Sequence, residues 1–186
     1  MTEKLYEVSK ETISIYKSNK LKFRKKKILV FGVGNEILTD DGIGPKLVKR
    51  MQKEFCSELI DFDTAFLGGM DLLEYIQGYE SVIFIDAIRT RNGIPGDVYF
   101  LKSSDFQETL HLSNIHDISF LTALKFGKKL GLKIPEEVHI IAVEIVEDLI
   151  FSNELSPKLE KRYNEIYKIV STFIFKIGKH KKLKIS

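Results

Sequence analysis

The sequence predicts an α/β protein in which helices cover both faces of a mostly parallel, twisted sheet of about five strands, forming a three-layer α/β/α sandwich. Two observations support this fold class. Near-continuous apolar runs such as VIFIDA at 82–87 lack the polar alternation of half-exposed strands, which is typical of strands buried on both faces. Segments with apolar residues at helical spacing alternate with these runs, as they do in α/β domains.

The elements can be placed from their apolar periodicity and from the glycine and proline residues that separate them. Turns of the Asn-Gly and Pro-Gly kind at 92–96 precede one short strand and predict that it runs opposite to the others. The predicted elements, in order, are strand 28–31, helix 43–55, strand 58–66, helix 70–76, strand 81–87, strand 98–101, helix 118–130, strand 138–143 and a helix from 157 to about 177.

Length and composition predict one globular domain. The chain has 186 residues, which suits a single core. We expect an α/β domain at 27–177, preceded by a basic extension at 1–26 that is either helical or disordered, and followed by a lysine-rich tail at 178–186. No apolar run reaches the roughly 18 residues of a membrane span, and the N-terminus lacks an apolar signal core. We therefore expect a cytoplasmic protein without membrane insertion.

The number of cysteines and the distribution of charge limit the kinds of site and partner that the protein can have. The single cysteine, Cys56, excludes an internal disulfide and a cysteine-based zinc site, and we expect it to be buried or half-buried. The net charge of +3 is uneven, because residues 28–175 carry 15 basic and 23 acidic residues. Such a body suits a metal cation or a basic partner. The lysine-rich ends lack interleaved aromatic residues and indicate solvated tails, so we expect no nucleic-acid binding.

The most informative segment is ILVFGVGNEILTDDGIG at 28–44. It reads as a buried strand, a glycine turn and a helix start. A dinucleotide fingerprint would need a third glycine where Ile37 stands, and its phosphates would lie at the helix start beside Asp40 and Asp41. Both features argue against a nucleotide. Helix capping explains one of these acids, whereas two in succession favour a functional site.

Ligands of open α/β sheets bind beyond the carboxyl ends of the strands, and three polar residues are predicted there. Asp41 follows the first strand, Asp86 ends the third, and His116 precedes the helix expected near Ile118. Two carboxylates and one imidazole suit zinc, and imidazole also suits nickel. Asp86 could instead cap a turn, and His116 could make a local hydrogen bond. Asp41 and Asp86 could also share a proton. His111, His139 and His180 carry less weight, and no GxSxG nucleophile motif occurs.

These residues carry a resemblance to a known family. ILVFGVGNEILTDDGIG resembles the N-terminal signature of the [NiFe]-hydrogenase maturation endopeptidases, and VIFIDAI, SNIHDISFLTAL and VEIVEDLIFSNELSPKLE resemble its later segments in the same order. The resemblance runs from about 28 to 170. It implies a metal-dependent endopeptidase that removes a C-terminal extension from the nickel-loaded precursor of the hydrogenase large subunit.

Carried over by motif, the resemblance assigns three residues to the metal and to catalysis: Asp41, Asp86 and His116. Nickel would be supplied by the precursor, and zinc or another divalent ion could substitute in vitro. Asp40 would cap the helix or orient Asp41, and a turn at Gly68-Gly69 would let the substrate backbone approach. We expect the partner to be the large-subunit precursor, and we expect the enzyme to be a monomer.

Two other interpretations stay open from the sequence. A chain of this fold could bind nickel or the precursor as a maturation chaperone without cutting it. A peptidase of the same fold could also act on a different precursor. A nucleotide-binding enzyme is a further alternative, which Ile37 and the paired acids oppose.

Overall fold

The computed structural model describes residues 28–66, 71–102 and 115–183, with the side chains of 115–121 and 180–183 left out of the description. The expected N-terminal extension at 1–26 and the turn at Gly68-Gly69 lie outside these ranges. The elements are β1 (Ile28–Val33), a 3₁₀ turn η1 (Thr39–Gly42), α2 (Ile43–Glu54), β2 (Ile60–Ala65), α3 (Leu72–Ile76), β3 (Ser81–Ile88), β4 (Val98–Lys102), α4 (Ile115–Lys129), β5 (Glu137–Glu144) and α5 (Pro157–Leu183).

The five strands form one mixed sheet in the order β2-β1-β3-β5-β4. The first four strands in that order run parallel, and β4 pairs antiparallel with β5. The predicted α/β sandwich with one reversed strand is therefore confirmed. Gly96, at φ +91°, supplies the left-handed backbone that the turn before β4 requires.

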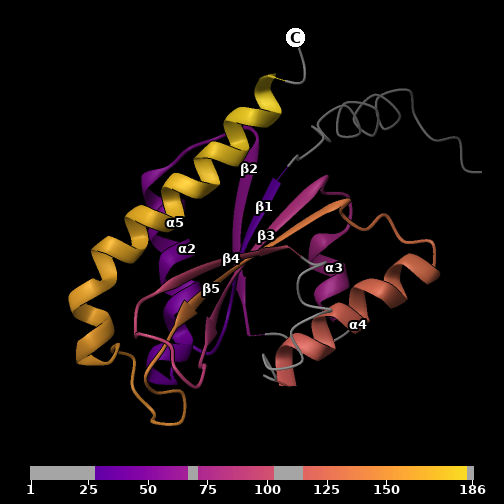
Figure 1. Ribbon diagram of the computed structural model, residues 1–186. Helices are drawn as coiled ribbons and strands as arrows, with labels where there is room; N and C mark the ends of the chain where they lie inside the picture. Colours follow the sequence, from indigo (N-terminus) through magenta and orange to yellow (C-terminus); the bar gives the residue numbers. More distant parts are fainter. Residues whose placement is uncertain (1–27, 67–70, 103–114, 184–186) are drawn as a thin grey trace, which may run out of the picture.

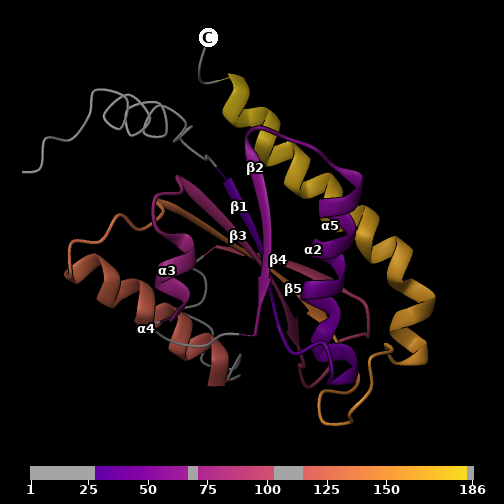
Figure 2. The same ribbon diagram turned by 180° about the vertical axis from the view of Figure 1, so that it is seen from behind.

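Helices cover both faces of the sheet, as Figures 1 and 2 show from opposite sides. On one face α2 and α5 pack against every second strand residue, including Ile28, Val30, Ile83 and Ile85. On the other face α3 and α4 pack against the alternate residues, among them Leu29, Phe31, Val82 and Phe84. The uninterrupted apolar runs exist because each strand contributes to two cores.

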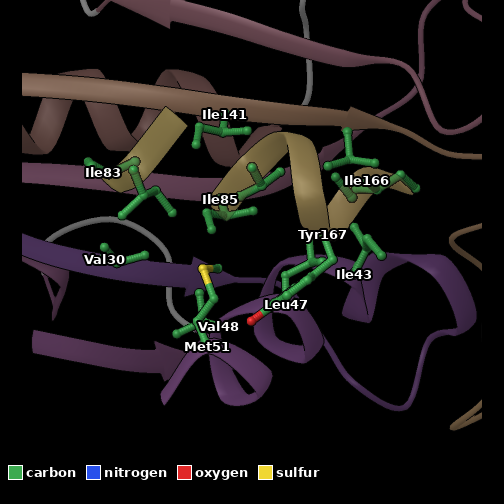
Figure 3. Close-up of a cluster of buried hydrophobic side chains, with 14 of the residues drawn as sticks. Val30, Ile43, Leu47, Val48, Met51, Ile83, Ile85, Ile141, Ile166 and Tyr167 are labelled. Carbon is green, nitrogen blue, oxygen red and sulfur yellow. The ribbon is translucent and has the colours of Figure 1, made fainter. Parts of the chain in front are cut away.

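The larger core lies between the sheet, α2 and α5 (Figure 3). Leu47, Val48 and Met51 of α2 and Ile166 of α5 are fully enclosed against β1 and β3. Fully burying a side chain of this size stabilises the fold by about 1.5–3 kcal/mol. This core fixes the position of α2, and so of the turn that precedes it.

Two features differ from the prediction. Helix α5 continues to Leu183, into the segment expected to be a tail. Cys56 is exposed rather than buried, because α2 ends at Glu54 and the chain leaves the core in an extended conformation at Phe55. Among the helices within the described ranges, none is both long and apolar enough to cross a membrane.

Candidate functional site

The loop from β1 to α2 is held tightly at the carboxyl end of the sheet. Gly34 has φ +138°, and a Cβ there would lie 2.1 Å from the carbonyl oxygen of Asp41. A Cβ at Gly44 would lie 2.3 Å from the carbonyl oxygen of Ile85, so the start of α2 packs directly on β3 next to Asp86. Gly34 and Gly44 thus allow the η1 turn and the end of β3 to meet at one rim.

The backbone of this turn is strained at Thr39. It is the one residue other than glycine with positive φ in the described part of the chain, at +45°. A β-branched residue in this region is unfavourable by about 1–3 kcal/mol. Its hydroxyl donates to the Ile150 carbonyl at 2.5 Å and its N–H donates to the Ser152 carbonyl at 2.9 Å. The surrounding structure therefore keeps Thr39 in its strained conformation.

Asp40 is fully buried and binds backbone from the loop between β5 and α5. Its Oδ2 accepts the N–H groups of Val146 and Glu147 at 3.1 and 3.2 Å, and its Oδ1 accepts the Ser156 N–H at 2.6 Å. Neither η1 nor α2 has a side-chain cap. The expected capping role of Asp40 is therefore wrong, and this carboxylate instead fastens two rim loops to each other.

Asp41 follows Asp40 but is only half-buried. Its Oδ2 accepts the N–H of Asn35 at 2.5 Å, which fixes the carboxylate relative to the glycine turn. Since η1 contacts β3, Asp41 lies on the same rim as the end of that strand. A half-buried, oriented carboxylate at this place has the character expected of a metal ligand.

Asp86 lies near the carboxyl end of β3 and is also half-buried. Its Oδ1 accepts the N–H of the next residue, Ala87, at 2.8 Å. It shares the strand face of Val82 and Phe84, which is the face covered by α3 and α4. The structure thus brings Asp41 and Asp86 to one rim and turns Asp86 toward the layer that contains α4.

His116 lies in the first turn of α4, which begins at Ile115 rather than near Ile118. Figures 1 and 2 show this end of α4 at the same end of the sheet as the start of α2 and the connection from β5 to α5. The side chain of His116 lies outside the described part of the structure. Among the side chains that are described, no three His, Cys, Asp or Glu residues cluster as a metal site.

Glu144, at the end of β5, is a rim carboxylate that the sequence analysis missed. It is 1% exposed, and its carboxylate accepts the N–H and the hydroxyl of Thr90 at 2.6 and 2.9 Å. Burial raises the pKa of the nearby Tyr99, and the negative charge of Glu144 raises it further. The sequence signal that could have identified Glu144 is its position as a polar residue at the end of the apolar run of β5.

Two other groups of residues are separate from the proposed set of Asp41, Asp86 and His116. The ring of His139 lies 6.4 Å from that of Phe173 in α5, which agrees with a packing role; His111 and the side chain of His180 are outside the described residues. A surface groove beside α2 is lined by four basic residues, Lys46, Lys49, Arg50 and Lys53, and by three glutamates, Glu36, Glu154 and Glu160. Lys49 forms an ion pair with Glu36, so at least one of these acids is already matched by a cation.

Comparisons with known proteins agree on one family. The family described as hydrogenase maturation protease matches residues 43–172. The hydrogenase 2 maturation protease of Escherichia coli K12 is 33% identical over 140 residues, covering 67% of this chain and 84% of the relative.

Solved structures have the same fold. The hydrogenase maturating endopeptidase HybD of Escherichia coli superimposes with a TM-score of 0.65 at 24% identity, over 82% of this chain and 94% of that one. A hydrogenase 2 maturation peptidase from a Thaumarchaeota archaeon gives 0.54 at 30% identity, over 80% and 98%. The fold, the matched segment and the 33% identical relative all agree. The chain therefore belongs to the hydrogenase maturation protease family.

Proposed function

We propose that this protein is an endopeptidase that removes the C-terminal extension from the nickel-loaded precursor of a [NiFe]-hydrogenase large subunit. Membership of the protease family and the names of its relatives support this class of reaction. The observation that carries the proposal is the pair of half-buried carboxylates, Asp41 and Asp86, at one rim of the sheet. His116, in the first turn of α4 at the same end, is the proposed third ligand.

Nickel enters this site as part of the substrate. The precursor supplies the ion, and Asp41, Asp86 and His116 complete its coordination sphere, with two anionic oxygens and one imidazole nitrogen. Oxygen and nitrogen donors of this kind also accept zinc and other divalent ions, which would substitute in vitro. The net charge of −8 over residues 28–175 favours a cation at this rim.

Recognition of the ion places the precursor's C-terminal peptide at the rim, where water attacks the scissile carbonyl. The contribution of this chain is orientation: the Asn35 N–H fixes the Asp41 carboxylate, and the Ala87 N–H fixes that of Asp86. A bound divalent ion can also polarise a carbonyl or lower the pKa of its water. If the ion only positions the substrate, precursor loaded with zinc should be processed like the nickel form, because the two ions have the same charge. If the ion activates water, the two rates should differ, because zinc and nickel differ in the acidity of their bound water.

The test is processing of purified precursor, followed by mass spectrometry of the large subunit. Single substitutions Asp41→Asn, Asp86→Asn and His116→Ala should each slow removal of the extension by about 100-fold or more, as loss of a metal-binding interaction typically does. Asp63→Asn is a matched control, because Asp63 also accepts the next N–H, at 2.8 Å, but is exposed on the edge strand β2.

Three outcomes would refute separate parts of the proposal. Normal processing by all three variants would refute the site assignment. Equal processing of precursor with and without nickel would refute recognition of the ion. A precursor that binds but keeps its mass would favour the chaperone interpretation, and processing of some other protein instead would change the substrate.

A further inference from the structure

The loop between β5 and α5 exposes three consecutive large apolar side chains. Leu149, Ile150 and Phe151 are 74, 60 and 78% exposed. Ile37, 52% exposed, lies beside them, because its carbonyl accepts the N–H of Ser152 at 3.0 Å. We call these four residues the apolar tip. Scattered apolar residues are common on protein surfaces, whereas a contiguous group of them marks a surface that contacts another molecule.

The apolar tip is held in place by hydrogen bonds to its own backbone. The Glu147 carboxylate accepts the N–H groups of Leu149 and Ile150 at 2.6 and 3.2 Å. The Ile150 carbonyl accepts the Thr39 hydroxyl at 2.5 Å. Turning these side chains inward would break those bonds, so the tip is presented to solvent in a fixed shape. A surface that is already ordered loses less conformational entropy when a partner binds.

The tip is continuous with the candidate site. The turn that binds it, at residues 37–41, also carries Asp41. On the other side, Asp148 forms an ion pair with Arg89 at 3.0 Å, and Arg89 directly follows the strand that carries Asp86. A protein whose peptide reaches the two rim carboxylates must therefore lie close to the apolar tip.

We propose that the apolar tip is the docking surface for the folded body of the precursor, which it contacts through an apolar hollow beside the precursor's C-terminal extension. This inference rests on the proposed function and assigns that function a binding surface. The tip is flanked by Glu147, Asp148 and Glu154, and these acids oppose attachment to an anionic membrane. Four side chains cover much less than the roughly 1,200 Å² of a stable dimer, so the tip fits best as one part of a larger contact that includes the site.

The experiment compares the double variant Leu149→Ser/Phe151→Ser with the control Leu130→Ser. Leu130 is 57% exposed but follows the end of α4, at the opposite end of the sheet. Affinity for nickel-loaded precursor is measured with Asp41→Asn present in every protein compared, so that cleavage is blocked and any loss of the nickel contact is the same for all of them. We expect the double variant to bind at least 10-fold more weakly and the control to bind normally. With Asp41 intact, the double variant should raise KM at least 10-fold and leave kcat within twofold.

Other outcomes overturn the inference. Unchanged affinity in the double variant would exclude the tip from the precursor interface. A dimer of the wild-type protein that the double variant loses, measured by sedimentation, would assign the tip to a second copy of this chain. If the wild-type protein binds phosphatidylcholine–phosphatidylglycerol vesicles and the double variant does not, the tip would be assigned to a membrane. With Asp41 intact, tip-dependent binding of precursor whose mass stays unchanged would instead refute the peptidase function and keep the docking surface.

Discussion

Asp40 and Asp41 are neighbours in the chain, yet they occupy different environments. Asp40 is fully buried and accepts three backbone N–H groups from the β5–α5 loop. Asp41 is half-buried and accepts the N–H of Asn35, within its own loop. A carboxylate excluded from water must find its hydrogen bonds inside the protein, whereas one near the surface keeps part of its hydration.

This difference explains why two acids stand in succession. The first joins the η1 turn to the loop that carries the apolar tip, and the second is presented beside Asp86 at the rim. One acid therefore holds the rim loops together, and the other is the one that we propose to act at the site. Helix capping, the structural alternative weighed from the sequence, accounts for neither residue, because η1 and α2 lack side-chain caps.

The largest effect should come from replacing Asp40 by its amide, with the same change at Asp41 as the comparison. Asp40→Asn removes the charge and turns an acceptor into a donor that faces a backbone N–H. We expect the free energy of unfolding to fall by about 3 kcal/mol. Asp41→Asn should change it by less than about 1 kcal/mol, since Asp41 is half-buried and the amide keeps an oxygen that can accept the Asn35 N–H. Urea unfolding measures both, and equal losses would contradict the division of roles.

Glu144 extends the comparison to a second buried carboxylate of the rim. Glu144→Gln keeps an acceptor for the Thr90 N–H and can donate to the Thr90 hydroxyl, but it loses the charge that strengthens both bonds. We expect a loss of about 2 kcal/mol in the free energy of unfolding, less than for Asp40→Asn. The pKa of Tyr99 should also fall toward its ordinary value, because Glu144 raises it.

The control for Glu144→Gln is Glu147→Gln. Glu147 also accepts two donors, the N–H groups of Leu149 and Ile150, but it is half-buried. Its substitution should cost less in unfolding free energy and should leave the ultraviolet titration of Tyr99 unchanged. A Tyr99 pKa that does not respond to Glu144→Gln would show that burial alone raises it.

Much of the fold follows from local sequence. Strands β1, β3 and β5 were predictable because both of their faces are apolar, and the reversal of β4 was predictable because Asn92-Gly93 and Pro95-Gly96 mark turns before it. Asp41 and Asp86 were placed correctly at one rim, since in a parallel sheet the carboxyl ends of neighbouring strands share an edge. These inferences need only the residues on either side of each strand end.

The parts that were not predicted depend on distant partners. The role of Asp40 is set by N–H groups more than 100 positions away, which no local pattern reveals. The hydrogen bonds of Thr39 to the loop around Ile150 are likewise long-range. The early start of α4 at Ile115 moved His116 from the loop into the helix, a shift of the size usual for helix boundaries. The ligand role of His116 stays a prediction.

A smaller effect than those of Asp40→Asn and Glu144→Gln should come from a hydrogen bond at the opposite end of the sheet. Asp61, early in β2, accepts the Tyr79 hydroxyl at 2.8 Å, a bond between two side chains and not to backbone. Tyr79→Phe should cost about 1 kcal/mol in unfolding free energy at neutral pH. Tyr75→Phe, at an exposed ring, is the control and should cost less.

This bond should also make stability fall at alkaline pH. Burial, and then the hydrogen bond to Asp61, raise the pKa of Tyr79 above its ordinary value. A folded pKa above the unfolded one means that the stabilisation is complete below about pH 10 and is lost as pH rises through the folded pKa. Above about pH 10 the wild-type protein should therefore lose stability more steeply than Tyr79→Phe. Parallel curves would show that neither burial nor Asp61 raises the pKa of Tyr79 in the folded state.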